Sequence, residues 1–214
     1  MRNNNTLKDF ISVYDNVLTK DYCKYIIETT KNADWVEQYY ELNGRIVSDG
    51  MQTCFNIGSK TKLMLTQPIK NTLDTYTKTI GEELFSVKEI SPIRLNKYEL
   101  NARMNPHIDH QPAYRLLSKG EEFKIDSGIT QDKLEKVKIY DSNAKNHVAG
   151  GIPILTLVGI LNDDFVGGEF IFWDEYAPVL KTGSLLVFPS NFLYKHAINS
   201  VRQGTRYSFI VWVW

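Results

Sequence analysis

Hydrophobic and polar positions follow two different periods along the chain, and the period changes near residue 90. After a short strand-like piece at Phe10–Tyr14, apolar residues of the first part recur at helical spacing. Thr19 is a candidate N-cap for a helix that ends near Asn32. A second helical pattern covers Ser59–Ile80 with Pro68 inside it, so one kinked helix and two shorter helices are both allowed.

From about residue 90 onward, apolar and polar residues alternate as in β-strands with one buried face. The first such strand, Pro92–Leu100, is followed by a turn and by a strand that carries His107 and Asp109. Further segments are short, rich in β-branched and aromatic residues, and separated by turn signals: Ile152–Leu161, Glu169–Trp173, Ser184–Phe188, Tyr194–Ile198 and Thr205–Trp214. Such strands after two helices predict a mainly β fold, a double-stranded β-helix or jelly roll, with the helices packed on one face.

A long polar segment, Gln111–Gly150, interrupts the β pattern. Its high charge and weak apolar rhythm make it a poor core element, and a loop of this length is typically either functional or disordered. Because it follows Asp109 directly, we expect it to lie over the functional site as a lid. We expect residues 1–214 to form one domain, with helical support over about 19–80 and a β core over about 90–214.

The composition is that of an ordinary soluble globular protein, with 43% hydrophobic and 23% charged residues. Acidic and basic residues number 25 each, so the formal net charge is zero and nothing suggests binding to nucleic acid. No apolar run is long enough to span a membrane, and the N-terminus lacks the apolar core of a secretory signal. We therefore expect a cytoplasmic protein without membrane contact, in which Cys23 and Cys54 are inert thiols.

His107 and Asp109 are the first candidates for chemistry. Residues two apart in a strand leave the same face with Cα atoms roughly 6.5 Å apart, so both side chains can reach one ion. With His196, which precedes the last strand pattern, they make the two-His-one-carboxylate set that holds non-haem Fe(II) and leaves other positions open. On the residues alone, the solvated side of a half-buried strand and a zinc site are alternatives.

Four stretches resemble the 2-oxoglutarate- and Fe(II)-dependent oxygenases, and within them the prolyl-4-hydroxylase-like branch. They are Leu95–Asp109, which has a Tyr ahead of His-x-Asp, Thr156–Phe172, Gly183–Phe188 and His196–Trp212. In the last stretch, Gly-Thr-Arg at 204–206 falls where the branch has Gly-x-Lys, and a Trp follows six residues later. The C-terminal sequence also looks similar to oxygenases encoded by tailed bacteriophages, for which the location would be the host cytoplasm.

The resemblance implies an Fe(II)-dependent dioxygenase that uses O₂ to convert 2-oxoglutarate to succinate and CO₂ and hydroxylates a C–H bond, with ascorbate as a candidate reductant. It makes His107, Asp109 and His196 the catalytic iron ligands. It places Arg206 on the distal carboxylate of 2-oxoglutarate, where a guanidinium can form two parallel hydrogen bonds. The charges of iron and Arg206 then balance those of Asp109 and 2-oxoglutarate.

Other residues have weaker assignments under the same resemblance. Tyr98 and Ser208 are candidates for the co-substrate site, Ser208 because it shares a strand face with Arg206. Trp212 lies on that face too and is a candidate for the substrate pocket, although a tryptophan on an inner strand often belongs to the core. His110 is expected to point away from the metal, and His147 lies in the insertion.

The branch implies a prolyl residue in a protein or peptide as the substrate, while free amino acids and other small molecules stay open. A nucleic-acid dealkylase of the same superfamily would have a second arginine in the closing strand, where this chain has Trp212. Zinc hydrolysis would leave Arg206 without a role. A non-enzymatic jelly-roll module would leave the set of His, Asp, His and Arg unexplained.

Overall fold

The computed structural model describes residues 6–42, 45–81, 87, 89–109, 124–125 and 153–214. Most of the predicted insertion, and with it the lid hypothesis, lies outside these residues, as do His110 and His147. Within the described residues, no helix combines the length and the apolar character that a membrane span requires.

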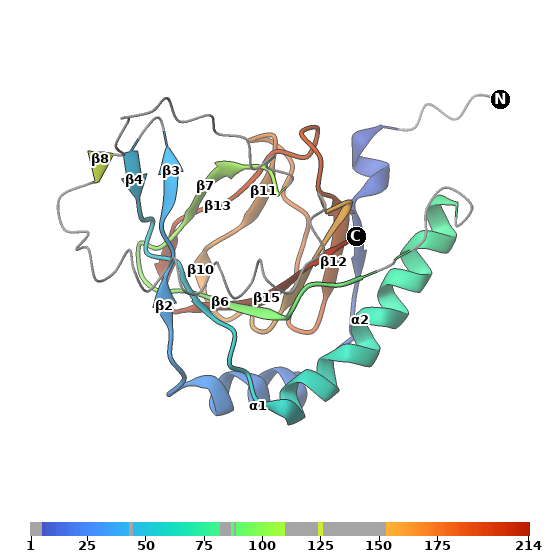
Figure 1. Cartoon of the computed structure of the whole chain (residues 1–214), viewed down its shortest axis with the longest axis horizontal. Coiled ribbons are helices and arrows are strands. Elements are labelled where there is room, and N and C mark those ends of the chain that lie inside the picture. The colour runs from blue at the N-terminus through green and yellow to red at the C-terminus, as the bar shows by residue number, and fades with distance from the viewer. Residues whose placement is uncertain (1–5, 43–44, 82–86, 88, 110–123, 126–152) are drawn as a thin grey trace, which may run out of the picture.

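Two α-helices lie on one side of the β structure (Figure 1). After the short 3-10 helix η1 (Leu7–Phe10), helix α1 (Lys20–Thr30) begins at Thr19, whose hydroxyl accepts a hydrogen bond from the Tyr22 amide at 3.2 Å. Helix α2 (Ser59–Ile80) has the predicted bounds and runs through Pro68 as one element. The helical layer predicted from the apolar spacing is therefore present.

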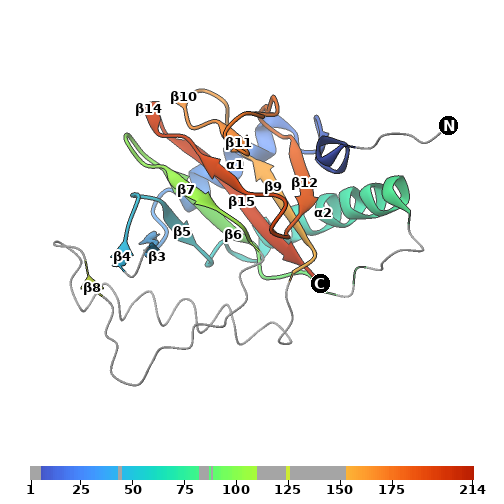
Figure 2. The ribbon, with the colours of Figure 1, turned by 90° about the horizontal axis from the view of Figure 1, so that it is seen from above.

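A seven-stranded antiparallel sheet, which we call the major sheet, forms the centre of the molecule. Figure 2 shows its four central strands side by side. Its order is β1 (Ser12–Tyr14), β12 (Leu185–Pro189), β9 (Leu155–Ile160), β15 (Arg206–Val213), β6 (Arg94–Tyr98), β5 (Gln52–Cys54) and β2 (Val36–Glu37). Strands far apart in sequence are thus neighbours, as in a jelly roll.

The minor sheet packs against one face of the major sheet and contains β11 (Phe170–Phe172), β13 (His196–Ile198) and β7 (Met104–His107). The remaining strands pair in two small sheets: β10 (Val166–Gly167) with β14 (Val201–Gln203), and β3 (Tyr40–Leu42) with β4 (Arg45–Val47) and β8 (Lys124–Ile125). The sequence pattern missed β2 to β5, because strands of two or three residues are too short to show a period.

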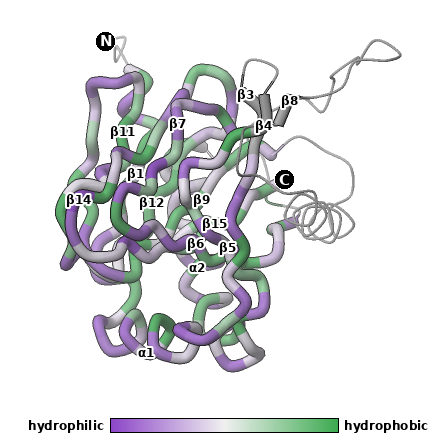
Figure 3. Tube along the Cα trace, turned by 90° about the vertical axis from the view of Figure 1, so that its left-hand side faces the viewer, coloured by the Kyte–Doolittle hydropathy of each residue, from purple (hydrophilic) through white to green (hydrophobic). Residues whose placement is uncertain are grey.

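Each face of the major sheet covers its own apolar cluster. Leu157, Phe209 and Val211 point toward α1 and α2, whereas Val158 and Ile210 point toward the minor sheet. Figure 3 shows the corresponding interleaving of hydrophobic and hydrophilic positions along the chain. The alternation of side chains along a strand therefore divides the molecule into a helix-covered face and a face between the sheets.

One glycine in β9 makes close packing on the helix side possible. Gly159 lies opposite Phe209 of β15, and a Cβ atom at Gly159 would lie 2.0 Å from Cε1 of the Phe209 ring. Only the absence of a side chain leaves room for this ring, which is fully buried. In the helix-covered core, the Phe209 ring therefore packs directly on the backbone of Gly159.

Candidate metal centre

His107, Asp109 and His196 converge between the sheets. Strand β13 pairs with β7 so that His196 lies opposite His107, and the ligand atoms of all three residues lie within 4.8 Å of one another. Nε2 of His107 is 3.8 Å from Oδ1 of Asp109, and Nε2 of His196 is 3.7 Å from Oδ2. One detail of the prediction is wrong: β7 ends at His107, so Asp109 lies in the bend after the strand rather than on it.

Backbone carbonyls orient both imidazoles. Nδ1 of His107 is 2.8 Å from the carbonyl oxygen of Asn105, and Nδ1 of His196 is 3.0 Å from that of Tyr194. A carbonyl can only accept, so each Nδ1 carries the proton and donates it, which leaves the Nε2 lone pairs directed at Asp109. Burial lowers the pKa of His196 to about 4, so this ring is neutral at physiological pH.

Asp109 is held in its ionised form. Burial raises the pKa of this carboxyl, whereas a positive charge on His196 or His107, a hydrogen bond from Thr156 and the charge of Arg94 lower it, and the lowering effects outweigh burial. The hydroxyl of Thr156 donates to Oδ2 of Asp109 at 2.6 Å and lies 2.8 Å from the hydroxyl of Ser190. Thr156 and Ser190 are buried in turn, so the carboxylate position is set by the major sheet.

Aromatic rings enclose the His196 side of the cluster. Phe170 stacks on the imidazole with ring centroids 4.9 Å apart and an interplanar angle of 13°, and Phe188 meets it edge-on at 5.0 Å. His107 is 21% exposed, against 4% for His196 and 5% for Asp109. The site is therefore closed on one side by apolar rings, and His107 is its most exposed residue.

A cavity extends from this cluster to Arg206. Besides the three clustered residues, its lining is Met51, Arg94, Asn96, Tyr98, Met104, Val158, Phe170, Ile198, Arg206, Ser208 and Ile210. Arg206 is 2% exposed, its Nη1 donates to the Ser208 hydroxyl at 2.8 Å, and its guanidinium carbon lies 5.2 Å from the centre of the Tyr98 ring. Among the described residues, no carboxylate pairs with Arg206. A buried cation of this kind needs an anionic partner, which a ligand can supply.

Some neighbours of the cavity were not identified from the sequence. Arg94 and Asn96 precede Tyr98 by four and two residues on β6. Because every second residue of a strand points to the same face, the predicted position of Tyr98 would have placed all three on one face. Trp212 is not among the cavity-lining residues; its ring lies 4.6 Å from the guanidinium carbon of Arg94. Gly168 has φ +66° and would place a Cβ 3.2 Å from Cδ of Arg206, so the predicted glycine turn also makes room for the Arg206 side chain.

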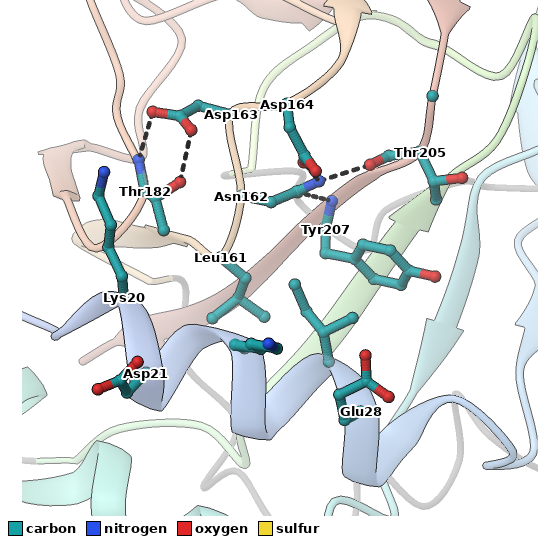
Figure 4. Close-up of a pocket in the computed structure, with 13 residues that line it drawn as sticks. Lys20, Asp21, Glu28, Leu161, Asn162, Asp163, Asp164, Thr182, Thr205 and Tyr207 are labelled. Atoms are coloured by element: carbon teal, nitrogen blue, oxygen red, sulfur yellow. Dashed lines mark hydrogen bonds between the residues drawn. The ribbon is translucent and has the colours of Figure 1, made fainter.

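A second hollow, between α1 and the turn after β9, has a different character. Figure 4 shows hydrogen bonds among the polar groups of its loops, whereas Lys20, Asp21 and Glu28 of α1 line it without such bonds in the picture. The Asn162 amide donates to Asp164 and to the Thr205 carbonyl at 2.7 Å each and accepts from the Tyr207 amide, while Asp163 accepts from Thr182. These loop groups pair with one another, and the metal-ligand cluster of the described residues lies elsewhere, so we do not take this hollow as the candidate active site.

Comparison with known protein families shows to which family the chain belongs. The family model described as the 2OG-Fe(II) oxygenase superfamily matches residues 93–214, more than half of the chain and all three clustered residues. The chain belongs to this superfamily. As a superfamily member it is a dioxygenase that uses Fe(II), 2-oxoglutarate and O₂. No curated protein matches the sequence significantly.

Solved structures with the same fold include three prolyl hydroxylases. The viral collagen prolyl hydroxylase of Paramecium bursaria Chlorella virus-1, in its 2OG complex, has 11% identity and a TM-score of 0.59, over 95% of this chain and 94% of that one. A Trichoplax adhaerens prolyl hydroxylase in complex with a hypoxia inducible factor peptide has 12% identity and a TM-score of 0.61, over 96% of this chain and 83% of that one. A Pseudomonas putida prolyl-4-hydroxylase has 12% identity and a TM-score of 0.54, over 95% of this chain and 91% of that one. The predicted jelly-roll fold class is thereby confirmed.

Proposed function

We propose that this oxygenase hydroxylates a prolyl residue in a protein or peptide and converts 2-oxoglutarate to succinate and CO₂. The observation that carries the proposal is one cavity with two different ends. His107, Asp109 and His196 converge at one end, and the buried Arg206 lies at the other. A keto acid with a second carboxylate fits this arrangement, because it can chelate a metal and form an ion pair at the same time.

The donor set fits Fe(II). Two neutral imidazoles and one carboxylate are the ligands of non-haem Fe(II) oxygenases, and they leave further positions for co-substrate and O₂. We assign His107, Asp109 and His196 as these ligands. When bound, iron supplies the activation of O₂ and orients the keto acid. The protein contributes ligand orientation through the carbonyls of Asn105 and Tyr194, and it excludes water from the His196 side through the aromatic rings.

Arg206 is assigned to the distal carboxylate of 2-oxoglutarate. Its guanidinium is planar and buried, so it can bind a carboxylate through two parallel hydrogen bonds with little competition from water. Ser208 already accepts from Nη1 and can turn its own proton toward the same carboxylate, and Tyr98 lines the cavity beside Arg206. Burial lowers the pKa of Arg206, but a guanidinium keeps its charge in proteins.

The prolyl substrate is supported by fold likeness to prolyl hydroxylases, one of them described with a bound hypoxia inducible factor peptide. The test is succinate release with Fe(II), 2-oxoglutarate and ascorbate, which we propose as the reductant, against prolyl peptides, amino acids and alkylated oligonucleotides. We expect a prolyl peptide to gain the mass of one oxygen in proportion to succinate. Oxidation of an oligonucleotide or of a non-prolyl metabolite instead would contradict the proposed substrate.

A further inference from the structure

Trp173 combines an unfavourable backbone conformation with a fixed side chain. It follows β11 and has a φ of 56°, in the left-handed region that bulky residues rarely adopt. It lies at the corner of a tight turn, in which the amides of Glu175 and Tyr176 donate to the carbonyl of Phe172 at 3.1 and 3.0 Å. Glycine, asparagine or aspartate fits such a corner at lower cost. A tryptophan held there indicates that its side chain has a role.

Trp173 binds the loop that leads to His196 at two points. Its indole Nε1 donates to the carbonyl oxygen of Leu193 at 2.6 Å. Its backbone amide donates to the carbonyl oxygen of Lys195 at 3.0 Å. The carbonyl between these two in sequence is that of Tyr194, which orients the His196 imidazole. Trp173 therefore holds the carbonyls on both sides of the one that orients His196.

Further contacts leave the Tyr194 carbonyl little freedom. The peptide unit that joins Leu193 to Tyr194 is bound at both ends, because its N–H donates to the Asn191 carbonyl at 3.0 Å and its own carbonyl accepts from Trp173. Tyr194 is 3% exposed, and its ring packs against the Trp173 ring with centroids 5.9 Å apart. Since the preceding peptide unit and the side chain are both fixed, the Tyr194 carbonyl cannot easily turn away from His196.

Trp173 itself lies outside the cavity. Its neighbour Phe172 pairs with His196 across the minor sheet, and the Phe172 ring lies 5.9 Å from the imidazole centroid. Trp173, in contrast, is not among the residues that line the cavity. Its ring contacts are with Phe172, Tyr176 and Tyr194. Any effect of Trp173 on the chemistry must therefore pass through the loop that it binds.

We infer that Trp173 is a positioning residue for the metal site. Through the carbonyls of Leu193 and Lys195 it fixes the Tyr194 carbonyl, which in turn directs Nε2 of His196 toward the metal. This inference rests on the proposed function, which makes His196 an iron ligand. Partners that orient a ligating histidine contribute to metal affinity, and their loss costs roughly ten- to a hundredfold. Because Trp173 acts one step further out, we expect an effect of roughly tenfold, at the lower end of this range.

Trp173→Phe tests the inference, because it keeps an aromatic ring and deletes the Nε1 donor. Fe(II) affinity is measured by anaerobic competition with a coloured chelator. Exchange of the His196 Nδ1 proton with water is measured by NMR on the protein without metal. We expect Fe(II) affinity to fall by roughly tenfold and the proton to exchange faster, because the carbonyl that holds it is less well fixed.

Trp35→Phe is the matched control. Nε1 of Trp35 also donates to a backbone carbonyl, that of Thr30 at 2.9 Å, but this residue packs on the helix-covered core. Deleting this bond should leave Fe(II) affinity and the exchange of the His196 proton unchanged. A loss of the same kind of hydrogen bond elsewhere is thereby separated from a loss in the loop before His196.

Trp173→Gly is the second test variant. Glycine removes the backbone cost of the left-handed conformation, so the turn should form at least as well without the indole. If Trp173 served the turn alone, Trp173→Gly would keep the wild-type Fe(II) affinity. We expect this variant instead to lose at least as much affinity as Trp173→Phe does.

The outcomes separate this inference from the proposed function. Wild-type Fe(II) affinity in either folded Trp173 variant overturns the role of Trp173, and so does a loss of affinity with unchanged exchange of the His196 proton. An equal loss of affinity in Trp35→Phe also overturns it. His196→Ala tests the assignment beneath: if this variant binds Fe(II) as wild type does, His196 is not a ligand and the proposed function has failed. If only His196→Ala loses Fe(II), the function stands without Trp173.

Discussion

Both faces of the major sheet cover buried apolar side chains, but only the face toward the minor sheet also buries a charged group. On the helix side, Leu157 and Phe209 are fully buried among other apolar side chains. On the side of the minor sheet, Arg206 and Ser208 are buried as deeply, yet they carry a charge and a hydroxyl. Apolar burial stabilises the fold directly, whereas a buried charge costs free energy unless it is paired. Burial alone therefore does not identify a core, and the face with buried polar groups is the one built for ligands.

Side chains along β15 point alternately to the two faces, so the polar Ser208 on the inner face is the direct neighbour of Phe209 in the helix-covered core. Substitutions of the polar residues on the inner face should impair chemistry and leave the fold intact, and substitutions of the apolar residues on the helix-covered face should do the reverse. The predictions below test this division, beginning with the largest expected effect.

Replacing Asp109 should abolish turnover. Asp109→Ala removes the anionic ligand, so Fe(II) binding and succinate release should fall to background while circular dichroism stays unchanged. Anaerobic titration with Fe(II) and 2-oxoglutarate measures the loss as absence of the visible keto-acid band. Asp174→Ala is the control, because this aspartate is 62% exposed and pairs with Lys195 on the surface. An unchanged band in Asp109→Ala would show that Asp109 is not a ligand.

Phe209→Ala should have the largest effect on folding. It empties the space over Gly159, and loss of a buried phenylalanine costs about 3–5 kcal/mol of the free energy of unfolding. Urea denaturation measures this cost, and Phe192→Ala, at a position 74% exposed, should cost little. Protein that remains folded should retain the wild-type half-saturating concentration of 2-oxoglutarate. A large increase in that concentration would contradict the separation of the two faces.

Arg206→Ala should weaken binding of 2-oxoglutarate without changing iron affinity. Loss of a buried charge-assisted pair costs roughly 2–4 kcal/mol, so the half-saturating concentration should increase at least about thirtyfold. Arg206→Lys should fall between wild type and Arg206→Ala. The exposed Arg202, in β14 just before β15, supplies the control Arg202→Ala. An unchanged half-saturating concentration of 2-oxoglutarate in Arg206→Ala would show that Arg206 does not bind the distal carboxylate.

Thr156→Val tests the weakest of these contributions. The substitution keeps the shape of the side chain but deletes the hydroxyl that donates to Asp109, which costs roughly 1–3 kcal/mol for the acceptor left behind. We expect Fe(II) affinity to fall by about tenfold or more, with recovery in Thr156→Ser. Equal affinity in all three proteins would show that the major sheet does not position the carboxylate.

Sequence reasoning was most successful where the pattern was long or local. The bounds of α2 followed from a helical period sustained over 22 residues, and the N-cap of α1 from one threonine. The convergence of His196 with His107 depends on the pairing of β13 with β7, which periodicity alone does not specify. Arg94 was missed for a related reason: its place near the metal follows from the register of three strands and from the Thr156 hydrogen bond.

The carbonyls that orient both imidazoles also bear on which metal the protein acquires in a cell. Asn105 and Tyr194 each lie two residues before the histidine that they orient, so the donor atoms are presented before any ion arrives. Such a rigid nitrogen and oxygen set binds divalent ions in the Irving–Williams order, in which nickel, copper and zinc exceed iron. Which metal the site binds then depends on which divalent ions are available while the protein folds. Protein from an overexpressing host or a nickel column should contain foreign metal, and active enzyme should require chelation followed by anaerobic loading with Fe(II).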